Sequence, residues 1–130
     1  MSNPSLINTA HLITAGDILT RTCHEAALAS GWWTDENHNL VLYNTAEKLI
    51  LIVTEVSDAM EADRKGAQDQ HLPHRTGLEV ELSDAVIRIF DLAGRMGLDL
   101  GTTIGEKLLY NSTRADHKPA NRKKPGGKKY

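Results

Sequence analysis

Two pairs of acidic residues with the same spacing are the features of this sequence most able to do chemistry. Glu55 precedes Asp58 by three positions, and Glu81 precedes Asp84 by three positions. Each pair lies in a stretch with helical periodicity, so both carboxylates of a pair share one helix face. Four carboxylates on two packed helices repel one another unless a cation lies between them. Mg²⁺ prefers oxygen ligands and is commonly held together with phosphates, so the pattern predicts a phosphate-cleaving enzyme.

The alternative is that these acids belong to solvated helix surfaces. A single pair would be interpreted in that way, because Glu and Asp are common on exposed helix faces. Here two pairs occupy matched positions on consecutive helices, at the margin of each apolar stripe. That placement makes side chains directed into a cleft between the helices about as well supported as a solvated surface.

Four helices are expected to position these residues, and no strand is expected. They are predicted at about 6–30, 44–64, 78–96 and 103–113, which makes the fold class all-α and the architecture a four-helix bundle. Gly31, Gly66 and Gly97 are placed to end helices. Asn44 with Glu47, and Thr103 with Glu106, have the spacing of capping boxes. The residues expected to face the core are Leu49, Val53, Val56 and Met60 in the second helix, and Leu82, Ala85, Val86, Ile89, Ala93 and Met96 in the third.

The 130-residue length favours one domain, which we place at residues 1–114, followed by a flexible basic tail at residues 115–130. Residues 114–130 hold seven basic residues and one acidic residue, which leaves a net charge of −8 on residues 1–113. No apolar run is long enough to cross a membrane, and no signal peptide is recognised. The single cysteine, Cys23, excludes an internal disulfide, so we expect a cytoplasmic protein.

Three segments taken together resemble a known family. Residues 47–64 (EKLILIVTEVSDAMEADR), 81–94 (ELSDAVIRIFDLAG) and 107–114 (KLLYNSTR) are similar in order and spacing to the MazG-like all-α nucleoside triphosphate pyrophosphohydrolases. The compact form resembles single-domain members from phages, for which the location would be the host cytoplasm. The resemblance implies cleavage between the α- and β-phosphates, giving monophosphate and pyrophosphate. It also implies Mg²⁺ as cofactor, for which Mn²⁺ can substitute.

The resemblance also assigns roles to particular residues. Glu55, Asp58, Glu81 and Asp84 become the catalytic metal ligands. Lys107, Asn111 and Arg114 would contact phosphates or ribose; without the acidic pairs they would be interpreted as an exposed helix end. Asp58 stands where the family usually has Glu, so its coordination is expected to be looser or through water. The general base is not assigned by the resemblance; Glu55 is our candidate, ahead of Glu61.

The residues for base recognition are less well defined. The family places the base between the bundle core and an N-terminal aromatic segment, which here suggests His24, Trp32 and Trp33. A stacked Trp and a hydrogen-bonding His would form a base pocket; alternatively, one Trp is a core residue and the other a dimer contact. We favour ordinary deoxynucleotides, dCTP or dGTP, because no segment is typical of a filter for damaged bases. His71 and His74 have the spacing of metal ligands, but no third metal ligand accompanies them. Cys23 is not expected to be a nucleophile.

Two further predictions concern partners. A different class of function, a helical nucleic-acid-binding or regulatory module that uses the basic tail, would show salt-sensitive binding lost on deletion of the tail.

Apolar residues on more than one face of the second helix predict a homo-oligomer, either a dimer or a dimer of dimers. A ferritin-like dimetal protein is set aside because no Glu is followed by His three residues later.

Overall fold

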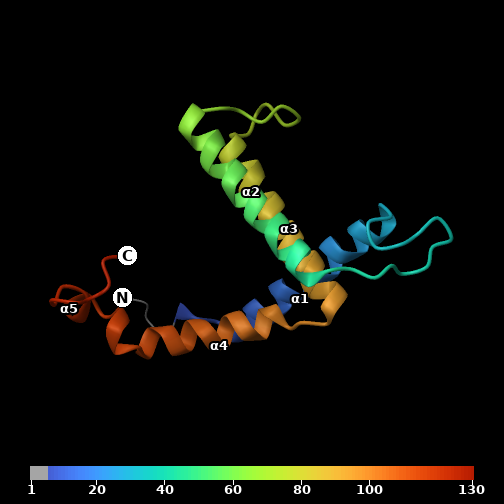
Figure 1. The fold of residues 1–130 in the computed structure, drawn as a ribbon. Helices are drawn as coiled ribbons and strands as arrows, with labels where there is room; N and C mark the ends of the chain where they lie inside the picture. The colour runs from blue at the N-terminus through green and yellow to red at the C-terminus, as the bar shows by residue number, and fades with distance from the viewer. Residues whose placement is uncertain (1–5) are drawn as a thin grey trace. The chain divides into compact units, whose positions relative to one another are not determined.

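The computed structural model describes residues 6–130, and the long elements of this part of the chain are all helices. They are α1 (Thr9–Ala29), α2 (Thr45–Lys65), α3 (Gly77–Met96) and α4 (Leu100–Thr113), followed by the 3₁₀ helix η2 (Ala115–His117) and the short α5 (Pro119–Arg122) (Figure 1). Within the described residues, β pairing is limited to two isolated bridges, Thr34 with Leu40 and Gln68 with Thr76. The all-α class is confirmed. No helix among these residues combines the length and the apolar character needed to cross a membrane.

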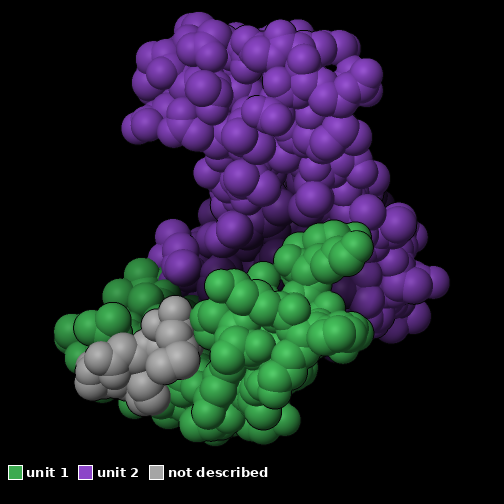
Figure 2. Space-filling view, turned by 90° about the vertical axis from the view of Figure 1, so that its left-hand side faces the viewer, with its two compact units in different colours: residues 1–18, 99–130 green, residues 19–98 purple. Residues whose placement is uncertain are grey.

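The chain divides into two compact units, coloured separately in Figure 2. One unit comprises the chain up to Ile18 together with Asp99–Tyr130, and the other comprises Leu19–Leu98. The first unit therefore contains α4 and the segment predicted as a tail, whereas the second contains α2 and α3. The single four-helix bundle stays a prediction.

Helices α2 and α3 form an antiparallel hairpin and lie side by side along their length (Figure 1). Asn44 caps α2 by accepting a hydrogen bond from the backbone N–H of Glu47, as the sequence predicts. The backbone dihedral φ is +59° at Gly66 and +70° at Gly97, where α2 and α3 end. These left-handed conformations suit glycine and close the helix ends.

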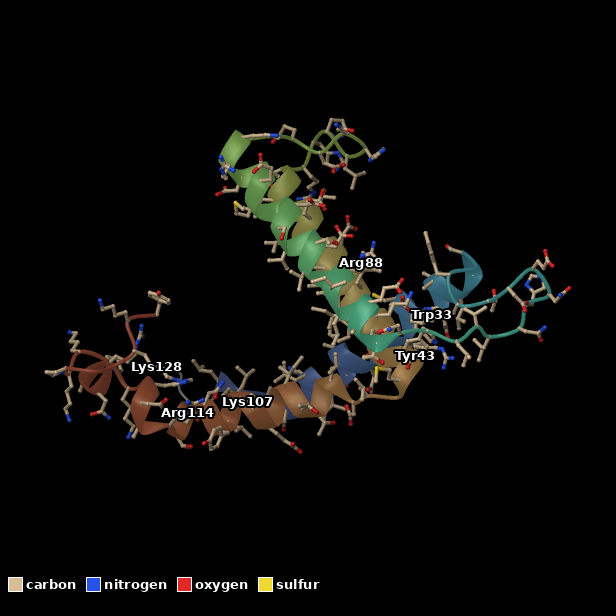
Figure 3. The ribbon with its side chains drawn as sticks, in the orientation of Figure 1. Trp33, Tyr43, Arg88, Lys107, Arg114 and Lys128 are labelled. Atoms are coloured by element: carbon tan, nitrogen blue, oxygen red, sulfur yellow. The ribbon has the colours of Figure 1, made fainter. Side chains whose placement is uncertain are left out.

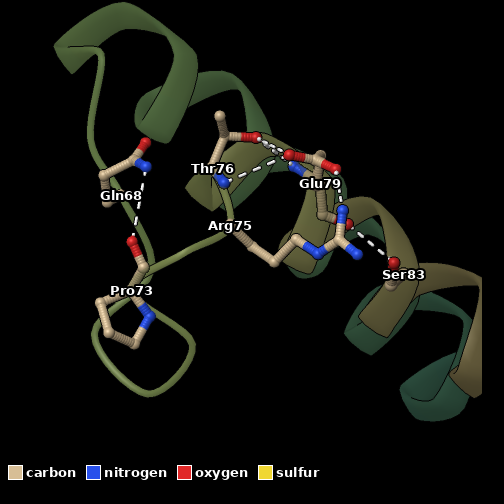
Figure 4. Close-up of polar contacts among 6 residues, drawn as sticks. All are labelled: Gln68, Pro73, Arg75, Thr76, Glu79 and Ser83. Atoms are coloured by element: carbon tan, nitrogen blue, oxygen red, sulfur yellow. Dashed lines mark hydrogen bonds and ion pairs between the residues drawn. The ribbon is translucent and has the colours of Figure 1, made fainter.

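Helix α3 begins with a complete capping box. The Thr76 hydroxyl accepts from the Glu79 N–H, and the Glu79 carboxylate accepts from the Thr76 N–H (Figure 4). Arg75 adds an ion pair to Glu79 at 3.2 Å, and Ser83 donates to the Glu79 carbonyl one turn later. These local contacts set where α3 begins, and therefore which residues its first turns present to α2.

Helix α4 begins earlier than the sequence predicts. Its cap is Asp99, whose carboxylate accepts from the Thr102 N–H, rather than Thr103 with Glu106. Thr103 instead donates its hydroxyl to the Asp99 carbonyl and lies inside the helix. Asp99 is itself a strong capping residue three positions before Thr102, so it competes successfully for the helix start.

Within the first unit, α1 and α4 approach closely at glycines. A Cβ added at Gly101 would lie 2.8 Å from the carbonyl oxygen of Leu12 and 3.0 Å from the Cα of Ile13, and one added at Gly16 would collide with the backbone of Gly101. The backbones of the two helices therefore touch at positions where no side chain fits.

The core is smaller than the apolar pattern predicts. The buried apolar residues are Trp33, Ala59, Ala85, Phe90, Leu92 and Ala93. Burial of Ala85 and Ala93 confirms two of the predicted positions. The α2 residues predicted to face the core are instead about half exposed in this chain: Leu49 52%, Val53 52%, Val56 50% and Met60 55%. On α3, Leu82, Val86, Ile89 and Met96 are also exposed, so periodicity identified apolar helix faces but not what covers them.

Candidate active site

Three of the four predicted metal ligands come together between α2 and α3. Glu55 of α2 and Glu81 and Asp84 of α3 each offer a carboxylate oxygen, and these oxygens lie within 4.8 Å of one another. All three side chains are partly buried. We call Glu55, Glu81 and Asp84 the acidic cluster; their role as metal ligands stays a prediction.

Asp58 lies outside the acidic cluster. It is one turn beyond Glu55 on α2, and its side chain is exposed. Its charge nevertheless acts on the cluster, because repulsion from Asp58 is among the causes that raise the pKa of Glu81. A direct ligand role is therefore supported better for the other three carboxylates than for Asp58.

The acidic cluster carries more negative charge than its neighbours neutralise. Burial raises the pKa of Glu81, with further contributions from a hydrogen bond to Glu55 and repulsion by the nearby carboxylates. Burial and repulsion from Glu55 raise the pKa of Asp84, although Arg88 acts in the opposite direction. Raised carboxyl pKa values mean that the ionised form is disfavoured, which a bound cation would reverse.

Arg88 supplies a cation that the sequence analysis missed. Its Nε donates to Oε1 of Glu55 at 2.7 Å, with the Arg88 side chain 44% exposed and the Glu55 side chain 14% exposed. Arg88, labelled in Figure 3, follows Asp84 by four residues, so the two side chains share a face of α3. The spacing of four residues between Asp84 and Arg88 was the sequence signal that could have identified Arg88 as a site residue. The contact across to α2 could be found only from the packing.

The residues of the acidic cluster fit a magnesium ion. All three donors are carboxylate oxygens, which this hard cation prefers, and they come from two rigid helices. Mg²⁺ requires six ligands and keeps several for water and phosphate oxygens, so three protein carboxylates are an appropriate number.

A pocket of about 380 Å³ opens beside the acidic cluster, entirely within the Leu19–Leu98 unit. Glu55 and Asp84 form part of its wall, so the carboxylates are accessible from it. The remaining lining residues are Cys23, Ala26, Ala27, Ser30, Trp32, Trp33, Lys48, Ile87, Arg88, Asp91 and Leu92. The wall thus combines carboxylates, aromatic rings and two basic residues.

The two tryptophans have different environments. Trp33 is 1% exposed, whereas Trp32 is 72% exposed. The Trp33 ring packs edge-on against Tyr43 with ring centroids 5.3 Å apart, and Lys48 Nζ lies 4.4 Å from the Trp33 centroid (Figure 3). Trp33 is thus a core residue that also lines the pocket, while Trp32 offers an exposed ring.

His24 is held behind the pocket by a network that includes a residue absent from the sequence predictions. Asp91 Oδ1 accepts from Trp33 Nε1 at 2.8 Å and lies 2.9 Å from His24 Nδ1. A Cβ added at Gly94 would lie 2.7 Å from His24 Cγ, so the glycine makes room for the imidazole. Asp91, unlike His24, is one of the residues that line the pocket.

Lys107, Asn111 and Arg114 lie in the other unit, on α4 and at its C-terminal end. Asn111 Oδ1 is buried without a hydrogen-bond partner among the described residues. Arg114 forms an ion pair with Asp116 at 2.6 Å, and Lys128 approaches the same carboxylate at 2.9 Å (Figure 3). These two cations hold the pKa of Asp116 well below its usual range. Their proposed contacts with substrate stay a prediction.

The remaining candidates carry no support as catalytic groups. Glu61 forms surface ion pairs with Arg64 at 2.9 Å and Lys65 at 3.2 Å, which fits a structural role. His71 and His74 are exposed in the loop between α2 and α3. Burial, together with the charge of Asp91, raises the pKa of the Cys23 thiol, so its reactive thiolate is disfavoured.

Comparison with known proteins does not add to this picture. No protein-family model matches the sequence, and no curated protein or solved structure shows significant similarity to it. The function must therefore be argued from the residues and geometry of the site.

The raised pKa of Glu81 leads to a stability prediction for the metal-free protein. A carboxyl whose pKa is higher in the folded than in the unfolded state destabilises the fold above that pKa, and the cost disappears as pH falls below the unfolded value. We therefore expect Glu81→Gln to increase the free energy of unfolding at pH 7.5, with the gain vanishing near pH 4. Chemical denaturation in EDTA at both pH values measures this.

Glu79 provides a control on the same helix with the opposite sign. Its hydrogen bonds to Thr76 lower its pKa, so its charge stabilises the fold at neutral pH. Glu79→Gln should decrease the free energy of unfolding at pH 7.5, with the difference fading as pH falls through the folded pKa. A loss of stability in Glu81→Gln at pH 7.5 would contradict the account of the acidic cluster.

Proposed function

We propose that this protein is a Mg²⁺-dependent nucleoside triphosphate pyrophosphohydrolase that releases a nucleoside monophosphate and pyrophosphate. The observation that carries the proposal is the acidic cluster, whose oxygens lie within 4.8 Å of one another and of which Glu55 and Asp84 line a pocket that also contains tryptophan. Carboxylates suited to Mg²⁺ and an aromatic surface suited to a base then line one cavity. The resemblance of residues 47–64, 81–94 and 107–114 to the MazG-like family supports the same reaction.

Different residues in and beside the pocket have different proposed roles. Glu55, Glu81 and Asp84 would hold Mg²⁺, with Asp58 acting through its charge or through water. When bound, Mg²⁺ neutralises phosphate charge and lowers the pKa of an attached water. Lys48 and Arg88 line the pocket and would bind phosphate oxygens. The exposed ring of Trp32 is available to stack on a nucleobase.

Glu55 remains our candidate for accepting the proton of the attacking water. Arg88 donates to its Oε1, and its carboxylate lies beside the other two acids of the cluster. Lys107, Asn111 and Arg114 belong to the proposal as phosphate or ribose contacts, with the buried, unpartnered Oδ1 of Asn111 as their supporting observation.

The exposed apolar stripes support a homo-oligomer. Leu49, Val53, Val56 and Met60 repeat at spacings of four, three and four along α2, and all are at least half exposed. Such a stripe is typical of a helix that packs against another helix. We propose that a second copy covers it, giving a dimer or a dimer of dimers.

Introducing a charge into the α2 stripe should dissociate this oligomer. We expect Val53→Glu to weaken self-association by at least about a hundredfold, because burying an unpaired charge costs several kcal/mol. Light scattering across a concentration series measures the molar mass. Lys65→Glu changes charge on α2 outside the stripe and should leave the mass unchanged. A monomeric wild type at micromolar concentration would contradict the proposal.

Product analysis tests the proposed reaction directly. Chromatography of ribo- and deoxynucleoside triphosphates incubated with the protein should show monophosphate and pyrophosphate with Mg²⁺, and neither product with EDTA. Release of diphosphate and phosphate would show that a different bond is cleaved. If no nucleotide is turned over, the proposed function is wrong.

A further inference from the structure

Asp91 is a pocket residue that the proposed chemistry does not use. It lies on α3, seven residues after Asp84, so at a rise of 1.5 Å per residue it is about 10 Å further along the helix. Both side chains line the same pocket. Asp91 therefore lies in the same pocket as Asp84, about two helical turns further along α3.

The two carboxylate oxygens of Asp91 have different partners. Oδ1 accepts from Trp33 Nε1 at 2.8 Å and is 2.9 Å from His24 Nδ1. No described residue donates a hydrogen bond to Oδ2, and the side chain is 18% exposed. Since the contacts of Oδ1 hold the group in place, Oδ2 is left as a charged acceptor available to a ligand.

The surroundings keep this acceptor in a fixed orientation. Trp33 is almost completely buried, and Lys48 and Arg95 lie 4.4 and 5.7 Å from its ring centroid. His24 packs against Gly94, where no larger side chain fits. A rigid acceptor distinguishes ligands better than a mobile one, because a mismatched group cannot be avoided by rotation of the side chain.

We propose that Asp91 Oδ2 reads the nucleobase by accepting a hydrogen bond from an exocyclic amino group. An ionised carboxylate accepts hydrogen bonds and donates none. Cytosine presents an amino group at position 4, where uracil and thymine present a carbonyl oxygen that the carboxylate would repel. The pocket would therefore favour amino-bearing bases, with Trp32 stacking on the ring. This inference rests on the proposed function for the placement of the triphosphate at the acidic cluster.

The pair dCTP and dUTP tests the inference because the two bases differ only in this amino group and the adjacent ring proton. We expect kcat/KM of the wild type to be about ten- to a hundredfold higher for dCTP, the range for one hydrogen bond to a charged group. Equal values, or a preference for dUTP, would overturn the inference.

Asp91→Asn should change the preference rather than simply weaken binding. The amide oxygen can still accept from His24 and Trp33, which orients the amide nitrogen where Oδ2 was. The pocket would then present a donor, so the ratio of dCTP to dUTP should fall at least about tenfold, toward dUTP. An unchanged ratio in a variant with the wild-type melting temperature would overturn the inference.

A binding measurement separates this inference from the proposed reaction. Quenching of tryptophan fluorescence by dCMP and dUMP, in EDTA, reports the base preference without any hydrolysis. Tighter binding of dCMP by the wild type, in a protein that turns over no triphosphate, would support the role of Asp91 and refute the proposed function. Hydrolysis of both triphosphates with equal binding of dCMP and dUMP would support the proposed function and refute the role of Asp91. The wild-type comparison remains decisive if Asp91→Asn does not fold.

Discussion

Replacing Glu55 by glutamine is expected to reduce triphosphate cleavage by at least about a hundredfold while the protein remains folded. Glu55 contributes one of the three carboxylate oxygens within 4.8 Å, and a lost charged ligand costs several kcal/mol of the stabilisation that a metal provides. Asp84→Asn removes a second oxygen of the same cluster and should have an effect of similar size. Steady-state kinetics at saturating Mg²⁺, together with calorimetric titration of Mg²⁺, measure turnover and metal affinity separately.

Folding should survive these changes because the acidic cluster is electrostatically strained without metal. Repulsion by Glu55 contributes to the raised pKa of both Glu81 and Asp84, so its removal relieves the other two carboxylates. The ion pair that Glu55 makes with Arg88 is lost, but Arg88 is 44% exposed and can be hydrated. The metal-free variant should therefore unfold at the same temperature as the wild type or at a higher one.

Asp58→Asn and Glu61→Gln are graded controls on α2. Asp58 is exposed and outside the cluster, so its loss should reduce turnover less than the loss of Glu55. Glu61 pairs with Arg64 and Lys65 on the surface, so its replacement should leave turnover within about twofold of wild type. Full activity in Glu55→Gln, or equal losses at all these positions, would contradict the assignment of the site.

Trp33→Ala is expected to destabilise the protein by about 3–5 kcal/mol, the range for truncating a large buried aromatic residue. Trp33 is 1% exposed, packs edge-on against Tyr43 and donates to Asp91, so its removal leaves a cavity and takes one of the two hydrogen-bonding partners from Asp91 Oδ1. Urea denaturation of the metal-free protein, followed by circular dichroism, measures the change. A loss below about 1 kcal/mol would show that Trp33 is not a core residue in solution.

Two neighbouring substitutions separate the contributions of Trp33. Trp32→Ala removes a ring of the same size that is 72% exposed, and should change stability by about 0.5 kcal/mol or less. Trp33→Phe keeps an aromatic ring in the core but loses the Nε1 donor to Asp91, so an intermediate loss is expected. The order of the three variants therefore distinguishes burial from hydrogen bonding.

Local sequence determined the helices and most of their ends. Asn44 and Thr76 cap α2 and α3 through backbone groups three residues away, and Gly66 and Gly97 close the same helices with positive φ. Such contacts need no partner from elsewhere in the chain, so spacing alone predicts the Asn44 cap and the two glycine ends; the Thr76–Glu79 spacing carried the same signal but was not among the predictions. The start of α4 was mispredicted because two capping residues, Asp99 and Thr103, lie four positions apart and the pattern does not rank them.

The pairing of acidic residues on each helix was also predictable, since a spacing of three places two carboxylates on one face of any helix. The contacts of Asp91, in contrast, were not predictable from the sequence. Its two partners, His24 and Trp33, are 67 and 58 residues away in the chain, and nothing local to Asp91 indicates either of them. The same is true of Arg88, whose partner Glu55 lies 33 residues away on α2.

The sequence by itself therefore determined the all-α class, the caps of α2 and α3 and the pairing of acidic residues, because each follows from contacts within about one helical turn. Only the tertiary structure decided which three carboxylates share one cluster, that Asp58 lies outside it, and that Asp91 rather than His24 lines the pocket. It also decided that the apolar stripe of α2 is exposed on the single chain. These properties depend on how distant segments pack, and helical periodicity specifies a face without specifying its partner.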